Sequence, residues 1–320
     1  MTRAPIALSC GEPAGIGPEI AQLAWYRLRE DVPFLWLGDP RHLPLDMPWQ
    51  RVQAPEDTAR IAPHAMPVWE LEFAGAATKG TADPANASGV IAAIETGVEL
   101  VRGGTARALC TAPIHKAALQ DGAGFAHPGH TEFLANLAAV EDVVMLLACE
   151  GLRVVPATIH IALADVPQAF TEELLRRQVA ITDAALRRDF GIATPRIAVA
   201  GLNPHAGEDG KMGQEELLWM RAAVARLAGE GFQITGPHPA DTLFHARARE
   251  SYDVAICAYH DQALIPIKTL DFDGGVNVTL GLPFVRTSPD HGTAFDIAGQ
   301  GIARPDSLIA ALRMADKMTR

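Results

Sequence analysis

The sequence of 320 residues lacks the features that would assign it to several large classes of protein. Its four cysteines are scattered and form no CxxC pair, so they are expected to be small core residues of a cytoplasmic protein. No signal peptide and no apolar run long enough for a membrane span is found, which argues against a membrane partner. The formal net charge of -11 argues against nucleic acid as a partner.

The chain also lacks the glycine fingerprints of the common nucleotide sites. Residues 11–17, GEPAGIG, have the wrong glycine spacing for a GxGxxG loop, and residues 205–213, HAGEDGKMG, match neither that loop nor a P-loop. A dinucleotide cofactor would therefore need a site of another kind.

What the chain does contain is a series of short apolar runs separated by helical patterns. Its length favours two domains or one large unit with two lobes. Strands are predicted at 5–10, 34–37, 108–111, 143–148, 154–161, 196–200 and 253–258. Helices are predicted at 20–28, 87–102, 171–190, 215–227 and 307–318, and irregular structure at 40–67. Because the strands do not alternate apolar and polar residues, we expect an α/β fold with buried, largely parallel strands.

Three histidines follow predicted strands. His160 ends the run RVVPATIH, His205 follows RIAVAGLNP, and His260 follows YDVAICAY. Ligands bind at the carboxyl ends of parallel strands, so these imidazoles are predicted to converge on a catalytic metal, with Asp241 and Asp261 as partners. The alternative is that some of them are surface histidines in loops.

Two cations lie in otherwise apolar surroundings near the third histidine. A buried Lys268 or Arg286 requires a partner, which is either an acidic group of the substrate or an internal carboxylate such as Asp271 or Asp273. Asn277 is either a satisfied strand amide or a contact for a substrate hydroxyl.

Two further segments have two interpretations each. His130 and Thr131 stand at a predicted helix start, where free N–H groups favour an anion, but Thr131 could equally be only a helix cap. Residues 287–299, TSPDHGTAFDIAG, either line a nucleotide or form an ordinary loop.

Taken together, the motifs resemble those of a known family. The chain is similar, along nearly its whole length, to the PdxA family of 4-hydroxythreonine-4-phosphate dehydrogenases. The motifs that carry this resemblance are GEPAGIGPE, TAPIHKAAL, GHTEF, GLNPHAGEDGKMG, PADTLF, YHDQ and GVNVTLGLPFVRTSPDHGTA. The resemblance implies two α/β/α lobes around a cleft, as in isocitrate and isopropylmalate dehydrogenases. The first lobe would comprise 1–128 plus about 287–320, and the second 129–286.

The resemblance also implies roles for individual residues in a homodimer whose active site lies at the subunit interface. The metal ligands would be His160, His205 and His260. The substrate contacts would be His130, Thr131, Lys268, Asn277 and Arg286. Asp241 and Asp261 match further active-site positions of the family.

The implied reaction uses NAD or NADP and a divalent metal (Zn, Mg or Co). It oxidises the C3 hydroxyl of 4-phosphooxy-L-threonine to 2-amino-3-oxo-4-phosphooxybutanoate, which then loses CO2 to give 3-amino-2-oxopropyl phosphate for pyridoxal 5'-phosphate biosynthesis. The alternative within the class is a paralogous dehydrogenase of a phosphorylated threonate or erythronate. Alternatives from other classes are a phosphate acyltransferase and a non-catalytic metal-dependent binding module.

Overall fold

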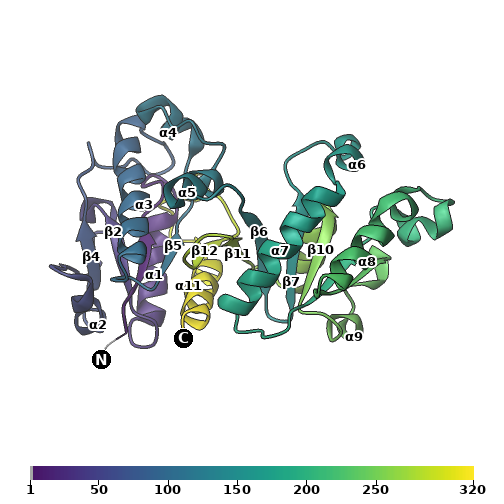
Figure 1. Ribbon diagram of the computed structural model, residues 1–320. Coiled ribbons are helices and arrows are strands. Elements are labelled where there is room, and N and C mark those ends of the chain that lie inside the picture. The colour runs from purple at the N-terminus through teal and green to yellow at the C-terminus, as the bar shows by residue number, and fades with distance from the viewer. Residues whose placement is uncertain (1–2) are drawn as a thin grey trace. The chain divides into compact units, whose positions relative to one another are not determined.

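The computed structural model describes residues 3–320, which form two compact units (Figure 1). Unit 1 comprises the described residues up to Val143 together with Val276–Arg320, and unit 2 is Val144–Gly275. The second lobe expected from the sequence, 129–286, is therefore longer than unit 2. Residues 129–143 belong to unit 1 because helix α5 (His130–Ala138) packs on helix α3 (Ala87–Arg102). Residues 276–286 belong there because their strands join the sheet of unit 1.

Unit 1 is built on a mostly parallel sheet with the strand order β3-β4-β2-β1-β5-β12-β11. Its strands are β1 (Ile6–Ser9), β2 (Phe34–Gly38), β3 (Trp49–Arg51), β4 (Met66–Glu70), β5 (Ala108–Thr111), β11 (Val276–Leu280) and β12 (Arg286–Pro289). Only the β11–β12 pair is antiparallel. Every residue of β1, β2, β5 and β12 is buried, which explains why these strands show no polar alternation.

Unit 1 also contains helices. They are α1 (Gly17–Leu28), α2 (Thr58–Ile61), α3, α4 (Lys116–Ala123), α5 and α11 (Asp306–Met318). Helix α3 packs on β1, β2 and β5 and itself contacts α4 and α5. Helix α11 packs on β12, β11 and β5 and also on α1. Its buried Asp316 accepts hydrogen bonds from the guanidinium groups of Arg3, Arg107 and Arg320, which tie the end of the chain to its beginning.

Within unit 2 the strand order is β6-β7-β10-β8-β9. The strands are β6 (Val144–Cys149), β7 (Leu152–Thr158), β8 (Arg196–Ala200), β9 (Gln233–His238) and β10 (Val254–Tyr259). All neighbours are parallel except β6 and β7. The helices are α6 (Val166–Ala169), α7 (Glu172–Arg188), α8 (Arg221–Gly229), α9 (Ala246–Arg249) and α10 (His260–Leu270).

The predicted α/β class and the largely parallel strands are confirmed, and α3 occupies the predicted range. The prediction of irregular structure at 40–67 was wrong in part, because it contains β3 and the start of β4. Strand β3 lies at the sheet edge with all its residues exposed, so it has no apolar pattern. All four cysteines are buried and free, as expected. Among the described residues, no helix has both the length and the apolarity to cross a membrane.

Candidate metal and anion sites

The three histidines lie at one edge of the sheet in unit 2. Strand β10 runs parallel between β7 and β8, with Tyr259 opposite Thr158 and Ile256 opposite Val199. His160 lies two residues beyond β7, His260 begins α10 directly after β10, and His205 lies in the turn η5 (Pro204–Gly210) after β8. The predicted location of these side chains at neighbouring strand ends is confirmed.

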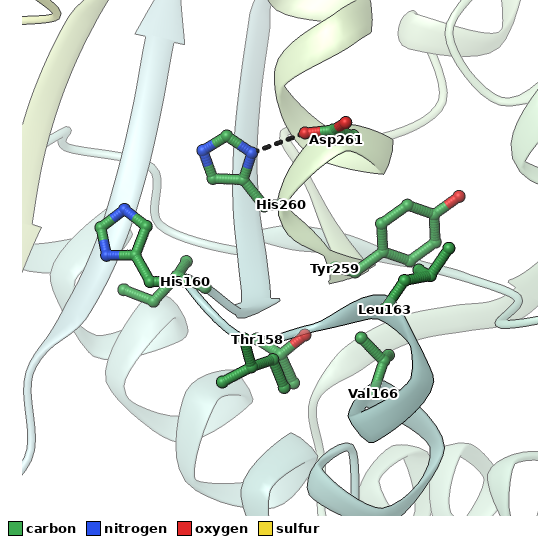
Figure 2. A pocket seen from close by; sticks show the side chains of 9 residues that line it. Thr158, His160, Leu163, Val166, Tyr259, His260 and Asp261 are labelled. Carbon is green, nitrogen blue, oxygen red and sulfur yellow. Dashed lines mark hydrogen bonds and ion pairs between the residues drawn. The ribbon is translucent and has the colours of Figure 1, made fainter.

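Two of the three imidazoles are close together. The ring centroids of His160 and His260 are 6.0 Å apart, and Figure 2 shows the two rings side by side. The Nδ1 atom of His260 is 2.7 Å from Asp261 Oδ1. A carboxylate on Nδ1 fixes the tautomer that leaves Nε2 free to bind a metal, which is the usual arrangement around ligating histidines. The two imidazoles can supply two of the three protein ligands that a catalytic divalent cation such as Zn²⁺ usually has.

These residues border a cavity of ≈ 340 Å³. Tyr259, Leu163 and Val166 form the side of the cavity away from the two imidazoles (Figure 2). The cavity thus combines imidazole and carboxylate side chains with a largely apolar wall, the usual composition of a small-molecule site.

His205 and Asp241 are not part of this pair. Across residues 3–320, no group of three or more His, Cys, Asp or Glu side chains is placed to hold a metal ion. Asp241 is exposed on the short helix η7 (Ala240–Thr242), which packs against the turn that carries His205. The structure brings His160, His260 and Asp261 together, and leaves His205 and Asp241 on adjacent elements.

A residue that the sequence did not single out joins two of the strand ends. Gln262, in the first turn of α10, accepts a hydrogen bond from the Ala258 backbone N–H at 2.7 Å through Oε1. Its Nε2 donates to the Gly201 carbonyl at 2.8 Å. The side chain therefore links the end of the strand that precedes His260 to the end of the strand that precedes His205. Its position in the YHDQ motif was the only available signal.

Unit 1 contains a buried cation without a carboxylate. Arg286, in β12, is only 2% exposed, and its Nη1 and Nη2 atoms donate to the hydroxyls of Thr279 and Thr111 at 2.9 and 2.6 Å. Its Nε has no hydrogen-bond partner, and no carboxylate of residues 3–320 forms an ion pair with it. The alternative that Asp271 or Asp273 neutralises it was therefore wrong. Burial lowers the pKa of Arg286 to about 10.

Two neutral polar groups accompany this cation. His130 begins α5, and its buried Nε2 has no partner. Burial, and then the charge of Arg286, hold the pKa of His130 well below its usual value, so its imidazole is neutral at pH 7. The Oδ1 atom of Asn277 is also buried without a partner. Because native proteins rarely leave such atoms unsatisfied, this group fits a bound anion with hydroxyl or amino groups.

The two remaining expected substrate residues lie on helices. Thr131 is the second residue of α5, whose N-cap is Gly129, so the interpretation of Thr131 as the cap was wrong. Lys268 lies near the end of α10, with its ammonium 5.5 Å from the centroid of the Phe272 ring.

The segment 287–299 continues β12 into a loop that contacts the glycine loop of residues 11–17. The Ile16 N–H donates to the Thr293 carbonyl at 3.0 Å. The Nε2 atom of His291 is buried and has no partner. A loop with such an atom offers a donor or acceptor for a ligand.

Comparisons with known proteins show the family of the chain. The family described as "Pyridoxal phosphate biosynthetic protein PdxA" matches residues 34–315. The 4-hydroxythreonine-4-phosphate dehydrogenase of Ruegeria sp. (strain TM1040) is 67% identical over 100% of this chain and 99% of its own length. That of Roseobacter denitrificans is 60% identical over 98% of this chain and 97% of its own.

A crystal structure of 4-hydroxythreonine-4-phosphate dehydrogenase from Klebsiella pneumoniae superposes with a TM-score of 0.88 at 35% identity. The match covers 99% of this chain and 100% of the other. The chain belongs to the PdxA family.

Proposed function

We propose that this protein oxidises the C3 hydroxyl of 4-phosphooxy-L-threonine with NAD and a divalent metal. The product, 2-amino-3-oxo-4-phosphooxybutanoate, then loses CO2 to give 3-amino-2-oxopropyl phosphate, a step in pyridoxal 5'-phosphate biosynthesis. Membership of the PdxA family and the names of its relatives support this activity.

The observation that carries the proposal is the buried guanidinium of Arg286. A cation that is 2% exposed and hydrogen-bonds to two hydroxyl groups is costly unless a ligand brings the counter-charge. A phosphate or carboxylate group of the substrate supplies that charge, and a planar guanidinium binds either group well.

The neighbours of Arg286 add specificity to the anion site. The free Nε2 of neutral His130 and the free Oδ1 of Asn277 can each bind a polar group of the substrate. Thr131 and Lys268 are proposed as further contacts for its charged ends. Fixing these ends orients the C3 hydrogen for transfer, which is a large part of the rate enhancement that an enzyme can provide.

The metal ligands are proposed to be His160, His205 and His260. A divalent cation held there would polarise the substrate oxygen at C3 as a Lewis acid. Asp261 accepts a hydrogen bond from Nδ1 of His260, and so fixes the ring that would bind the cation. Asp241 and Asp261 are the proposed catalytic carboxylates, as candidates to take the proton from the C3 hydroxyl.

The nicotinamide cofactor would accept hydride from C3. We propose that the loop 287–299 contributes to its site, because His291 contains a buried Nε2 without a partner there. The proposal that this loop binds the cofactor depends on this atom and on the contact between the loop and the glycine loop of unit 1.

We also propose that the active form is a homodimer with a shared site. Large apolar side chains are exposed in the segments that follow each of the three histidines. They are Ile161 and Leu163 after His160, Met212, Leu217 and Leu218 after His205, and Ile265 after His260. A second subunit that covers these side chains would remove them from water.

An assay of NADH formation with 4-phosphooxy-L-threonine tests the proposal. Activity should disappear with a chelator and return when Zn²⁺, Mg²⁺ or Co²⁺ is added. Activity that is indifferent to metal removal would refute the metal-dependent mechanism. Faster turnover of 4-phosphothreonate or 4-phosphoerythronate would instead support the paralogous dehydrogenase.

A mixing experiment tests the shared site. Subunits carrying His205→Ala and subunits carrying Lys268→Ala should each be inactive, and dimers formed from both should recover part of the activity. No recovery in mixed dimers would contradict a site built from two chains.

A further inference from the structure

The turn that carries His205 has an unusual backbone. Six consecutive residues, from His205 to Gly210, have positive φ, with values of 52, 48, 77, 39, 54 and 86°. Residues other than glycine normally enter this left-handed region singly, at a cost of about 1–2 kcal/mol each. Four residues of this run are not glycine, so the turn needs strong external support.

A buried carboxylate supplies this support. Glu216 is 1% exposed, and its Oε1 accepts a hydrogen bond from the Asn203 backbone N–H at 2.8 Å. Its Oε2 accepts a second hydrogen bond, from Asn203 Nδ2, at 2.9 Å. Hydrogen bonds to a carboxylate are stronger than those between neutral groups, so Glu216 fixes both the backbone and the side chain of Asn203.

Close packing holds the turn against Glu216 and Asn203. A Cβ atom on Gly207 would be 2.7 Å from Glu216 Oε2, and one on Gly213 would be 2.3 Å from the Asn203 side chain. The Ala206 N–H donates to the Asn203 carbonyl at 3.0 Å. The turn therefore begins at Asn203 and wraps around the carboxylate, with His205 two residues beyond the fixed point.

We propose that Glu216 is a positioning residue, which holds the left-handed turn and thereby directs His205 toward the metal. The inference rests on the proposed function, in which His205 is a metal ligand. Glu216 touches neither substrate nor metal in this scheme, and it acts through Asn203. A purely structural carboxylate would contribute to the stability of the fold but not to the affinity for metal.

Isothermal titration of the metal-free, full-length protein with Co²⁺ separates these roles. Glu216→Gln should bind Co²⁺ about 10- to 100-fold more weakly, the usual effect of losing a partner behind a metal ligand. The matched control is Glu215→Gln. Glu215 is next to Glu216 in the sequence, and its carboxylate accepts a hydrogen bond from Asn203 Nδ2 but none from the Asn203 backbone. The Co²⁺ affinity of Glu215→Gln should therefore differ from that of the wild type by less than about threefold.

A second substitution tests the strain directly. Glu208 has φ 39° and is exposed, and glycine adopts positive φ without the steric cost of a Cβ. Glu208→Gly should therefore restore at least about fivefold of the Co²⁺ affinity that Glu216→Gln loses, since 1 kcal/mol of relieved strain is worth about that factor. Thermal unfolding of all variants is measured in parallel, so that unfolding of the protein is distinguished from displacement of His205.

The outcomes differ for the two proposals. Wild-type Co²⁺ affinity in folded Glu216→Gln would overturn the positioning role while leaving the metal site intact. A loss of affinity that Glu208→Gly does not restore would also overturn it, because strain would not be the cause. If His205→Ala binds Co²⁺ as tightly as wild type, the metal-site assignment itself fails, and the role of Glu216 fails with it.

Discussion

The buried guanidinium of Arg286 leads to a prediction in which stability and function change in opposite directions. Arg286→Met keeps much of the side-chain volume and removes the charge. Burial lowers the pKa of Arg286 from 12.5 to about 10, which corresponds to a cost of about 3 kcal/mol for keeping it charged, at about 1.4 kcal/mol per pKa unit. The hydroxyls of Thr111 and Thr279 lose a donor in the variant, at about 1 kcal/mol each.

The ligand-free variant should therefore be about 1 kcal/mol more stable than the wild type, as measured by urea unfolding. Its kcat/KM should fall by a factor of about 30 to several thousand, because truncating one partner of a buried charge pair costs about 2–5 kcal/mol. Inorganic phosphate should stabilise the wild type, by about 2.7 kcal/mol at a hundredfold excess over Kd, and should not stabilise the variant.

Arg107→Met is the matched control, because Arg107 is also largely buried but is paired with Asp316 at 2.6 Å. This variant should lose about 3 kcal/mol of stability and should keep the response to phosphate. The assignment of Arg286 as the anion-binding cation would be refuted if Arg286→Met were destabilised like the control and still bound phosphate with wild-type affinity.

Three further predictions concern other parts of the molecule. Because the folded protein holds His130 neutral, the unfolded chain binds more protons below pH 6.5, and the free energy of unfolding should fall on acidification by up to about 1.4 kcal/mol per pH unit. In His130→Asn, urea unfolding at several pH values should show a smaller slope. Asp316→Asn should cost about 3 kcal/mol in urea unfolding, because the largely buried guanidinium of Arg107 loses its charge partner, and no loss would contradict that role. Gln262→Ala should cost about 1–3 kcal/mol, because the N–H of Ala258 and the carbonyl of Gly201 lose their partners; Gln262→Glu, which keeps only the acceptor, should lie in between.

Several elements could be predicted from sequence because the signal is local. The apolar runs at 34–37 and 108–111 became β2 and β5, and the pattern at 87–102 became α3. A short run without polar alternation must be covered on both faces, so the parallel sheet followed as well. The placing of His160, His205 and His260 at strand ends followed from the apolar runs at 154–161, 196–200 and 253–258.

Other elements could not be predicted because their signals are weak or non-local. Helix α10 contains Pro266 and starts directly after a strand, so its periodicity was masked. Strands β11 and β12 belong to unit 1 because β12 pairs with β5, a contact between residues far apart in the chain, and β11 pairs with β12.

The sequence by itself determined the α/β class, the family and the types of residue available for chemistry, because these depend on short patterns and motifs. Only the tertiary structure decided which of those residues have partners. Folding brings together the chain segments that bury Arg286 between hydroxyl groups and that let Gln262 link two strand ends. The hydrogen bonds from Asn203 to Glu216 also join two separate segments. Whether a polar atom has a hydrogen-bond partner depends on its surroundings in the folded protein, and no local sequence pattern encodes those surroundings.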